Sequence, residues 1–268
     1  SIHNAENPTI EISEADRVAA LNHLLAAVEA HSRGRSVQAA GEAEKAIKAG
    51  ASHPAVYYLL GFLLYKSDLA RAIQALSRSA SDDHLALASE LLIGTILEEQ
   101  QSYEEAVVAY LKAMCQADIT TLPTEMGSSL RVQYHQISEQ LIKMQDEEKM
   151  RFVCRSINVQ LMRRGWRQQV SSIRQLLPAD SPEAPPNALV MLMTLPNSDQ
   201  IITGLSRAQR LVNTNALLPA LEELYFDLQL APTEPLLHEL IATMMVKREH
   251  PEAAIEKYLL ISKKYELM

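Results

Sequence analysis

Small residues recur about every 34 residues along the chain, and this spacing constrains the fold more than any other feature of the sequence. Ala106 has counterparts one and two periods earlier, at Ala72 and Ala39. Gly94 is matched in the same way by Gly61, one residue off the strict period because of a shorter loop. A fixed period of about 20 to 50 residues is the signature of a repeat architecture.

A second register with the same spacing lies near the C-terminal end. Its members are Ala208, Ala220 and Leu224, followed 34 residues later by Ala242, Ala254 and Tyr258. Two antiparallel helices approach closely only where their crossing point carries small residues. The sequence therefore predicts an all-α protein of helical hairpins, in which stacked neighbours bury the apolar face that each hairpin leaves open.

These units resemble tetratricopeptide repeats (TPRs). The residues that carry the resemblance are Ile93, Gly94, Ala106, Tyr110 and Ala113 in the clearest unit, Leu60, Gly61, Ala72 and Leu76 in the unit before it, and Ala208, Ala220, Pro232, Ala242, Ala254 and Tyr258 in the C-terminal pair. The match covers roughly residues 20–117 and 200–265. The resemblance implies a TPR-like superhelix (an α-solenoid), with a division into two halves left open.

Three segments follow from these registers. We expect a TPR-like array of three hairpins over residues 1–118, an irregular helical middle over 119–186 and a TPR-like pair over 187–268. In the middle segment, Thr121 or Thr124 is predicted to cap a helix that ends near Met144, and residues 147–177 to form a hairpin with its turn at Gly165. A proline-rich joint over 178–186 and a short helix from Asn187 to Leu195 complete the prediction.

Composition narrows the class further. Hydrophobic residues make up 47% of the chain and charged residues 22%, which is ordinary for a folded protein, and the net charge of −8 disfavours non-specific binding to nucleic acid. Cys115 and Cys154 are too few for a disulfide framework. No stretch approaches the about 18 apolar residues of a membrane-spanning helix. We expect a cytoplasmic location, and a processed chain or a fragment, since the sequence lacks an initiator Met.

No pattern in the sequence predicts catalysis. The nucleophile, zinc-protease and phosphate-binding signatures are all missing, and the nearest pair of histidines, His23 and His31, lies eight residues apart. A helix would separate the two by about 12 Å, which is too far for one metal ion. We therefore expect a non-catalytic protein without cofactor or metal.

The TPR resemblance implies a concave groove lined by the first helix of each hairpin. The residues expected there are Leu24, Val28 and His31 in the first unit, Tyr58, Phe62, Tyr65 and Lys66 in the second, and Leu91, Thr95 and Glu98 in the third. An exposed apolar groove with a polar rim is typical of a surface that binds a helix or an extended segment. The occupant stays open between a partner protein and the chain's own helix around residues 121–144.

One binding mode of TPR proteins is excluded by the residues present. Some members bind the C-terminal carboxylate of a chaperone through Lys and Asn at concave positions. Leu24, Val28 and Tyr58 occupy those positions here, so this role does not carry over.

A basic span offers a second candidate surface. From Lys149 to Ala179 the chain has seven basic residues and no acidic one, which leaves a net charge of −15 on the remainder. The candidate residues for an anionic partner are Arg155, Arg163, Arg164, Trp166 and Arg167. Pairing with acidic residues of the same protein is the alternative.

The sequence as a whole predicts an interaction scaffold or adaptor with a protein partner. Two other functions stay open: a regulator that contacts nucleic acid through the basic 149–174 hairpin, and a subunit of a homo-oligomeric assembly. Nucleic acid is the less expected partner, and no membrane partner is expected.

Overall fold

The chain is all-α, as its periodicity predicts. The computed structural model describes residues 13–121, 127–168, 170–171 and 197–266, and these contain helices and turns but no strand. The proline-rich joint and the short helix predicted over 187–195 lie outside the described residues. No helix among the described residues is long and apolar enough to cross a lipid bilayer.

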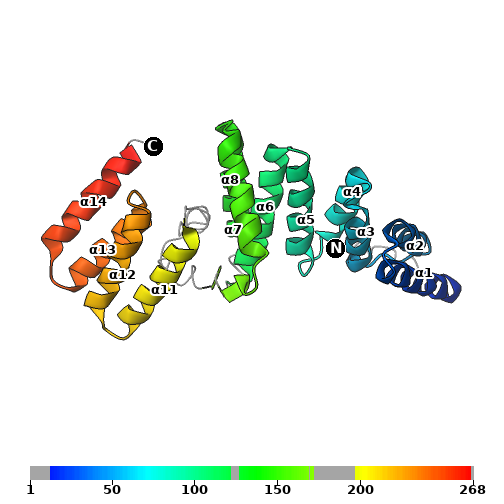
Figure 1. Ribbon diagram of the computed structural model, residues 1–268, viewed down its shortest axis with the longest axis horizontal. Coiled ribbons are helices and arrows are strands. Elements are labelled where there is room, and N and C mark those ends of the chain that lie inside the picture. The colour runs from blue at the N-terminus through cyan, green and yellow to red at the C-terminus, as the bar shows by residue number, and fades with distance from the viewer. Residues whose placement is uncertain (1–12, 122–126, 169, 172–196, 267–268) are drawn as a thin grey trace, which may run out of the picture. The chain divides into compact units, whose positions relative to one another are not determined.

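The structure divides into two compact units, residues 1–109 and 110–268. The first contains α1 (Glu14–Ser32), α2 (Ser36–Lys48), α3 (Pro54–Leu64), α4 (Leu69–Ser79), α5 (Ala86–Glu99) and the start of α6 (Tyr103–Ile119). The second contains the rest of α6, then α7 (Gly127–Lys143), α8 (Glu147–Leu161), α11 (Ser198–Asn213), α12 (Leu217–Leu230), α13 (Pro235–Lys247) and α14 (Pro251–Glu266) (Figure 1). The division into three segments at 118 and 186 stays a prediction.

Local sequence accounts for where the helices of the first unit begin and end. The Ser13 hydroxyl accepts a hydrogen bond from the backbone N–H of Asp16 at 3.1 Å, and the Asp68 carboxylate accepts one from Arg71 at 3.2 Å. Each satisfies a backbone donor that the first helical turn leaves free. Gly34 and Gly50, with φ of +74° and +100°, take the left-handed conformation directly after α1 and α2.

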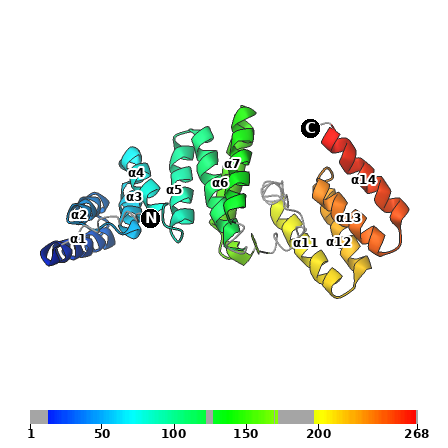
Figure 2. The ribbon, with the colours of Figure 1, turned by 180° about the vertical axis from the view of Figure 1, so that it is seen from behind.

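Consecutive helices pack as hairpins inside each unit. The pairs α1–α2 and α3–α4 in the first unit, and α11–α12 and α13–α14 in the second, lie side by side in both views (Figures 1 and 2). Each hairpin also contacts the next, through α2–α3, α4–α5 and α12–α13. The apolar face of one hairpin is thus covered by its neighbour.

The residues of the 34-residue registers lie at these helix contacts. Fully or almost fully buried are Ala27, Ala39, Ala43 and Ala46 in the first hairpin, Gly61, Ala72, Leu76 and Ser79 in the second, Ala106, Tyr110 and Ala113 in α6, and Ala208, Ala220, Leu224, Ala242 and Ala254 in the second unit. The helices of the second hairpin approach closely at Gly61, because a Cβ atom added there would lie 2.8 Å from Leu76 Cδ2 and 3.1 Å from the Ala72 carbonyl oxygen. The small residues therefore set how near the helices come.

Tyr258 departs from its register. It is 44% exposed, whereas its counterpart Leu224 is buried. Leu224 lies in α12, which α13 covers, but no helix follows α14 among the described residues. A large side chain at this position is buried only when another helix packs beside it.

The structure describes the helix predicted to be capped by Thr121 or Thr124 from Gly127 onward, as α7. Thr121 lies in the turn after α6, where its hydroxyl donates to the Asp118 carbonyl oxygen at 2.7 Å. Thr124, the other predicted cap, lies outside the described residues. Two hydrogen bonds connect α6 to the helices after it: Tyr134 Oη donates to Asp118 Oδ2 at 3.0 Å in a buried contact, and Asn158 Nδ2 donates to Tyr110 Oη at 2.9 Å in a partly buried one.

Replacing Gly61 with alanine tests the close approach. We expect Gly61→Ala to lower the free energy of unfolding by about 1 to 3 kcal/mol, because the methyl group overpacks the contact with Leu76. Gly41→Ala is the matched control, since Gly41 lies inside α2 with nothing within 4 Å of an added Cβ. The control should raise stability by about 0.5 to 1 kcal/mol through its helix propensity. Chemical denaturation followed by circular dichroism measures both, and equal effects of the two substitutions would contradict the packing role of Gly61.

Candidate functional site

A row of aromatic side chains lies on the surface of the first unit, across α1 and α3. The His31 ring meets the edge of Phe62 with 5.9 Å between ring centroids, and Phe62 stacks on Tyr65 at 5.7 Å. Lys66 Nζ lies 5.3 Å from the centroid of the Tyr65 ring. Phe62 and Tyr65 are three residues apart, so one helical face presents both.

Apolar side chains of α1 extend this row. Val18, Leu21, Leu25 and Val28 are spaced by three and four residues, and all are exposed, Leu25 to 68%. The buried side of α1 is formed by alanines, so the large side chains of the helix are left on its outer side. We name the surface made by these four residues with His31, Phe62, Tyr65 and Lys66 the α1–α3 face.

The predicted groove residues differ in how far their side chains are exposed. Val28, His31, Phe62 and Lys66 are exposed, with Phe62 at 39%. The remaining members of the second and third units are partly buried: Tyr58, Tyr65, Thr95 and Glu98. Leu24 of α1 is also partly buried. Burial raises the pKa of Tyr58 above its ordinary value.

Leu91 is a correction to the predicted groove. It is only 8% exposed, so its side chain belongs to the interior and not to a binding surface. In the same turn of α5, the Thr95 hydroxyl donates to the Leu91 carbonyl oxygen at 2.9 Å. Repeat positions that match in sequence need not match in exposure, because exposure depends on which helices lie next to them.

Val18 and Leu21 are surface residues that were not predicted as part of the site. Both are exposed and continue the line of Leu25 and Val28. Their spacing was visible in the sequence, but periodicity alone does not tell which of two apolar sides of a helix faces the core. The alanines on the other side of α1 are the signal that could have decided it.

The basic residues gather near a turn of the second unit. Arg163 and Arg164 follow the end of α8, Gly165 has a φ of +87°, and Trp166 begins a further helical stretch. The Arg167 guanidinium lies 5.3 Å from the centroid of the Trp166 ring. Arg155 lies on α8, about two turns before this turn. All four arginines are exposed.

A buried carboxyl group between α11 and α12 is a feature that sequence reasoning missed. Asp227 is 1% exposed, and its Oδ2 has no hydrogen-bond partner. It fits because Gly204 lies against it on α11, where the carboxylate leaves no room for a Cβ atom. Burial, followed by the nearby charge of Glu223, raises the pKa of Asp227 to about 7, although Arg207 acts in the opposite direction. Arg207 Nε itself lies 3.6 Å from Glu223 Oε2.

Neither a match to a known protein nor a group of metal-binding side chains assigns a function to the described part of the chain. No protein-family model matches the chain, and no curated protein matches it. Among the residues that the structure describes, no cluster of three or more His, Cys, Asp or Glu side chains could hold a metal ion.

The raised pKa of Asp227 predicts an unusual dependence of stability on pH. Between about pH 4 and pH 7 the folded protein keeps the proton on Asp227 and the unfolded chain releases it, so unfolding releases a proton. The free energy of unfolding should then fall as pH rises, by up to about 1.4 kcal/mol per pH unit from this group. The loss should end above the folded pKa.

Asp227→Asn isolates this contribution, because asparagine has a similar shape and does not titrate. Thermal unfolding from pH 4 to pH 8, compared between the wild-type protein and Asp227→Asn, should show the wild type losing stability relative to the variant as pH rises. Glu223→Gln should make this loss smaller and end it at a lower pH, since removal of the neighbouring negative charge lowers the folded pKa of Asp227. Parallel pH profiles for the wild type and Asp227→Asn would show that the carboxyl pKa is not raised.

Proposed function

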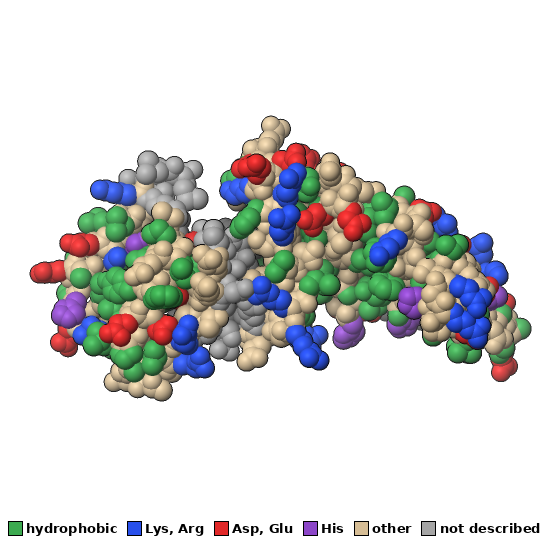
Figure 3. All heavy atoms as spheres, in the orientation of Figure 1, with side chains coloured by type: hydrophobic (Ala, Val, Ile, Leu, Met, Phe, Trp, Pro, Cys, Tyr) green, Lys and Arg blue, Asp and Glu red, His purple; other side chains and the backbone are tan. Residues whose placement is uncertain are grey.

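We propose that the protein is a non-catalytic interaction scaffold that binds an amphipathic helix of a partner protein on the α1–α3 face. The observation that carries the proposal is the continuous exposed row from Phe62 and His31 to Val28, Leu25 and Leu21. Exposed apolar patches of this kind, rimmed by charged residues, are typical of protein-binding surfaces. Figure 3 shows hydrophobic side chains reaching the surface of this unit between charged ones.

The repeat architecture supports the same proposal. We propose that the hairpins of each unit are TPR-like repeats, since the residues of the 34-residue registers lie buried at the helix contacts. In an array of helical hairpins, each hairpin contacts only the hairpins next to it. The array therefore keeps long surfaces exposed, and these are available to partners. A fold alone does not dictate function, so the proposal depends on the α1–α3 face itself.

The spacing on α1 favours a helical partner over an extended one. The intervals of three and four residues from Val18 to Val28 are those of a seam along which two helices pack. The row extends about 15 Å along α1, which corresponds to two to three turns of a partner helix. Fully burying one Leu, Val or Phe side chain contributes about 1.5 to 3 kcal/mol, so a few such contacts can exceed the cost of association.

Selection of peptides followed by substitution of Phe62 tests the proposal. A displayed library of amphipathic helical peptides is selected on the wild-type chain, and the affinities of the enriched peptides are measured on variants. Phe62→Glu should weaken them at least about tenfold, because it removes the central aromatic contact and places a charge in an apolar interface.

Phe152→Glu is the matched control for the selected peptides. Phe152 is an exposed phenylalanine of the second unit and is not part of the α1–α3 face. Affinity for this variant should equal that of the wild type, and the helicity of both variants should stay unchanged by circular dichroism. Peptides that bind Phe62→Glu as tightly as the wild type would show that the α1–α3 face is not the binding surface.

A further inference from the structure

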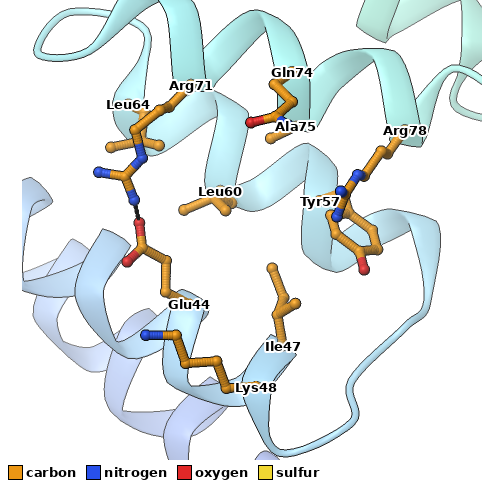
Figure 4. A pocket seen from close by; sticks show the side chains of 10 residues that line it. All are labelled: Glu44, Ile47, Lys48, Tyr57, Leu60, Leu64, Arg71, Gln74, Ala75 and Arg78. Atoms are coloured by element: carbon orange, nitrogen blue, oxygen red, sulfur yellow. Dashed lines mark hydrogen bonds and ion pairs between the residues drawn. The ribbon is translucent and has the colours of Figure 1, made fainter.

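A pocket of about 300 Å³ lies between α2, α3 and α4 in the first unit. Figure 4 shows Ile47 and Leu60 at its centre, with charged side chains at both ends. This volume is at the low end for ligand sites and accommodates one or two side chains of a bound segment. The pocket does not use the aromatic row of the α1–α3 face.

At one end of the pocket, the positive charge of Arg71 is paired with carboxylates. Arg71 Nη2 pairs with Glu44 Oε1 across the helices, and Arg71 Nη1 lies 3.5 Å from Asp68 Oδ2. The Arg71–Glu44 pair joins α4 to α2 at that wall of the pocket (Figure 4). Because Arg71 already has two carboxylate neighbours, it offers little to a further anion.

The other end carries positive charge without a carboxylate. The Arg78 guanidinium lies over the Tyr57 ring, 5.4 Å from its centroid, at the end of the pocket away from Arg71 (Figure 4). Lys48 also lines the pocket, but its ammonium group points toward Glu44 at the Arg71 end (Figure 4). Among the residues that the structure describes, Arg78 has no acidic partner within 4 Å. An arginine stacked on an aromatic ring keeps its N–H donors available for a carboxylate.

We propose that this pocket binds an acidic peptide segment of a partner protein, with one large apolar side chain on Ile47 and Leu60 and a carboxylate at Arg78. The apolar floor disfavours a purely charged ligand, and the Arg78 guanidinium, which has no acidic partner, disfavours a purely apolar one. The net charge of −8 on the chain repels long polyanions, whereas a short segment with a few carboxylates meets the local positive end.

The inference goes beyond the proposed function, because the two surfaces use different sides of α3. Tyr58, Phe62 and Tyr65 belong to the predicted groove side, whereas Tyr57 and Leu60 line the pocket. A substitution in one surface leaves the other unchanged. Failure of the pocket proposal is therefore distinguishable from failure of the helix-binding proposal.

A nuclear magnetic resonance titration of the full chain with three short capped peptides tests the pocket. The first peptide, Glu-Glu-Leu-Glu-Glu, has both features. In Glu-Glu-Ser-Glu-Glu the apolar side chain is replaced, and in Lys-Lys-Leu-Lys-Lys the charge is reversed. We expect saturable shifts at Ile47, Tyr57 and Arg78 with the first peptide, and affinities at least about tenfold weaker for the other two.

Arg78→Glu should weaken the first peptide at least about tenfold, because it replaces the donor by a like charge. Lys257→Glu is the matched control, since Lys257 also lies over a tyrosine ring, 5.4 Å from the centroid of Tyr225, in the second unit. The Lys257→Glu variant should bind the first peptide with the same affinity as the wild type.

Three results would overturn the proposal: no saturable shift at these residues up to about 5 mM peptide, equal affinity for Arg78→Glu and Lys257→Glu, or equal affinity of the leucine and serine peptides. A titration with hexanoate tests whether the pocket instead binds a small molecule. If this small acid bound the pocket more tightly than the acidic peptide, the site would belong to a small molecule, and the peptide assignment would be wrong.

Discussion

The close approach of helices at small residues is the constraint on which the other features of this protein depend. At Gly61 the backbone of α3 lies against Leu76 of α4 with no room for a Cβ atom, and in the first hairpin Ala27, Ala39 and Ala43 are fully buried. Because alanine and glycine fill these contacts, the large side chains of the same helices must lie elsewhere. They pack against the neighbouring hairpin or remain at the surface, where they form the α1–α3 face.

At one position of the repeat, the requirement for a small buried residue is met in some hairpins but not in all of them. Ala46, Ser79, Ala113 and Asp227 occupy equivalent places in their hairpins, and each is at most 1% exposed. Alanine needs no polar partner there, but the Ser79 hydroxyl and one Asp227 oxygen are buried without a hydrogen bond. A buried polar group without a partner costs free energy, and a carboxyl group lowers that cost by keeping its proton. The raised pKa of Asp227 is thus a consequence of the crossing geometry.

Much of the fold could be predicted from the sequence, because helix class and core positions follow from spacing. The register residues from Ala39 to Ala254 are buried as their period indicates. The exposure of Tyr258 and the burial of Leu91 could not be predicted, since both depend on which helix lies next to them. The pocket was also beyond sequence reasoning. It brings together Lys48, Tyr57 and Arg78 from three helices, and no local pattern relates these residues.

The helix α3 connects the two proposed surfaces. Its sequence from Pro54 to Leu64 is apolar or aromatic on all sides, a pattern typical of a helix that is packed all round. Among the described residues, α2 and α4 pack most closely against it, and part of its apolar surface stays exposed, as at Phe62. Phe62 and Tyr57 lie on these exposed parts. The His31 ring of α1 packs against Phe62, and the Arg78 guanidinium of α4 lies over the Tyr57 ring. A helix with exposed apolar surface on two sides can thus take part in two separate binding surfaces.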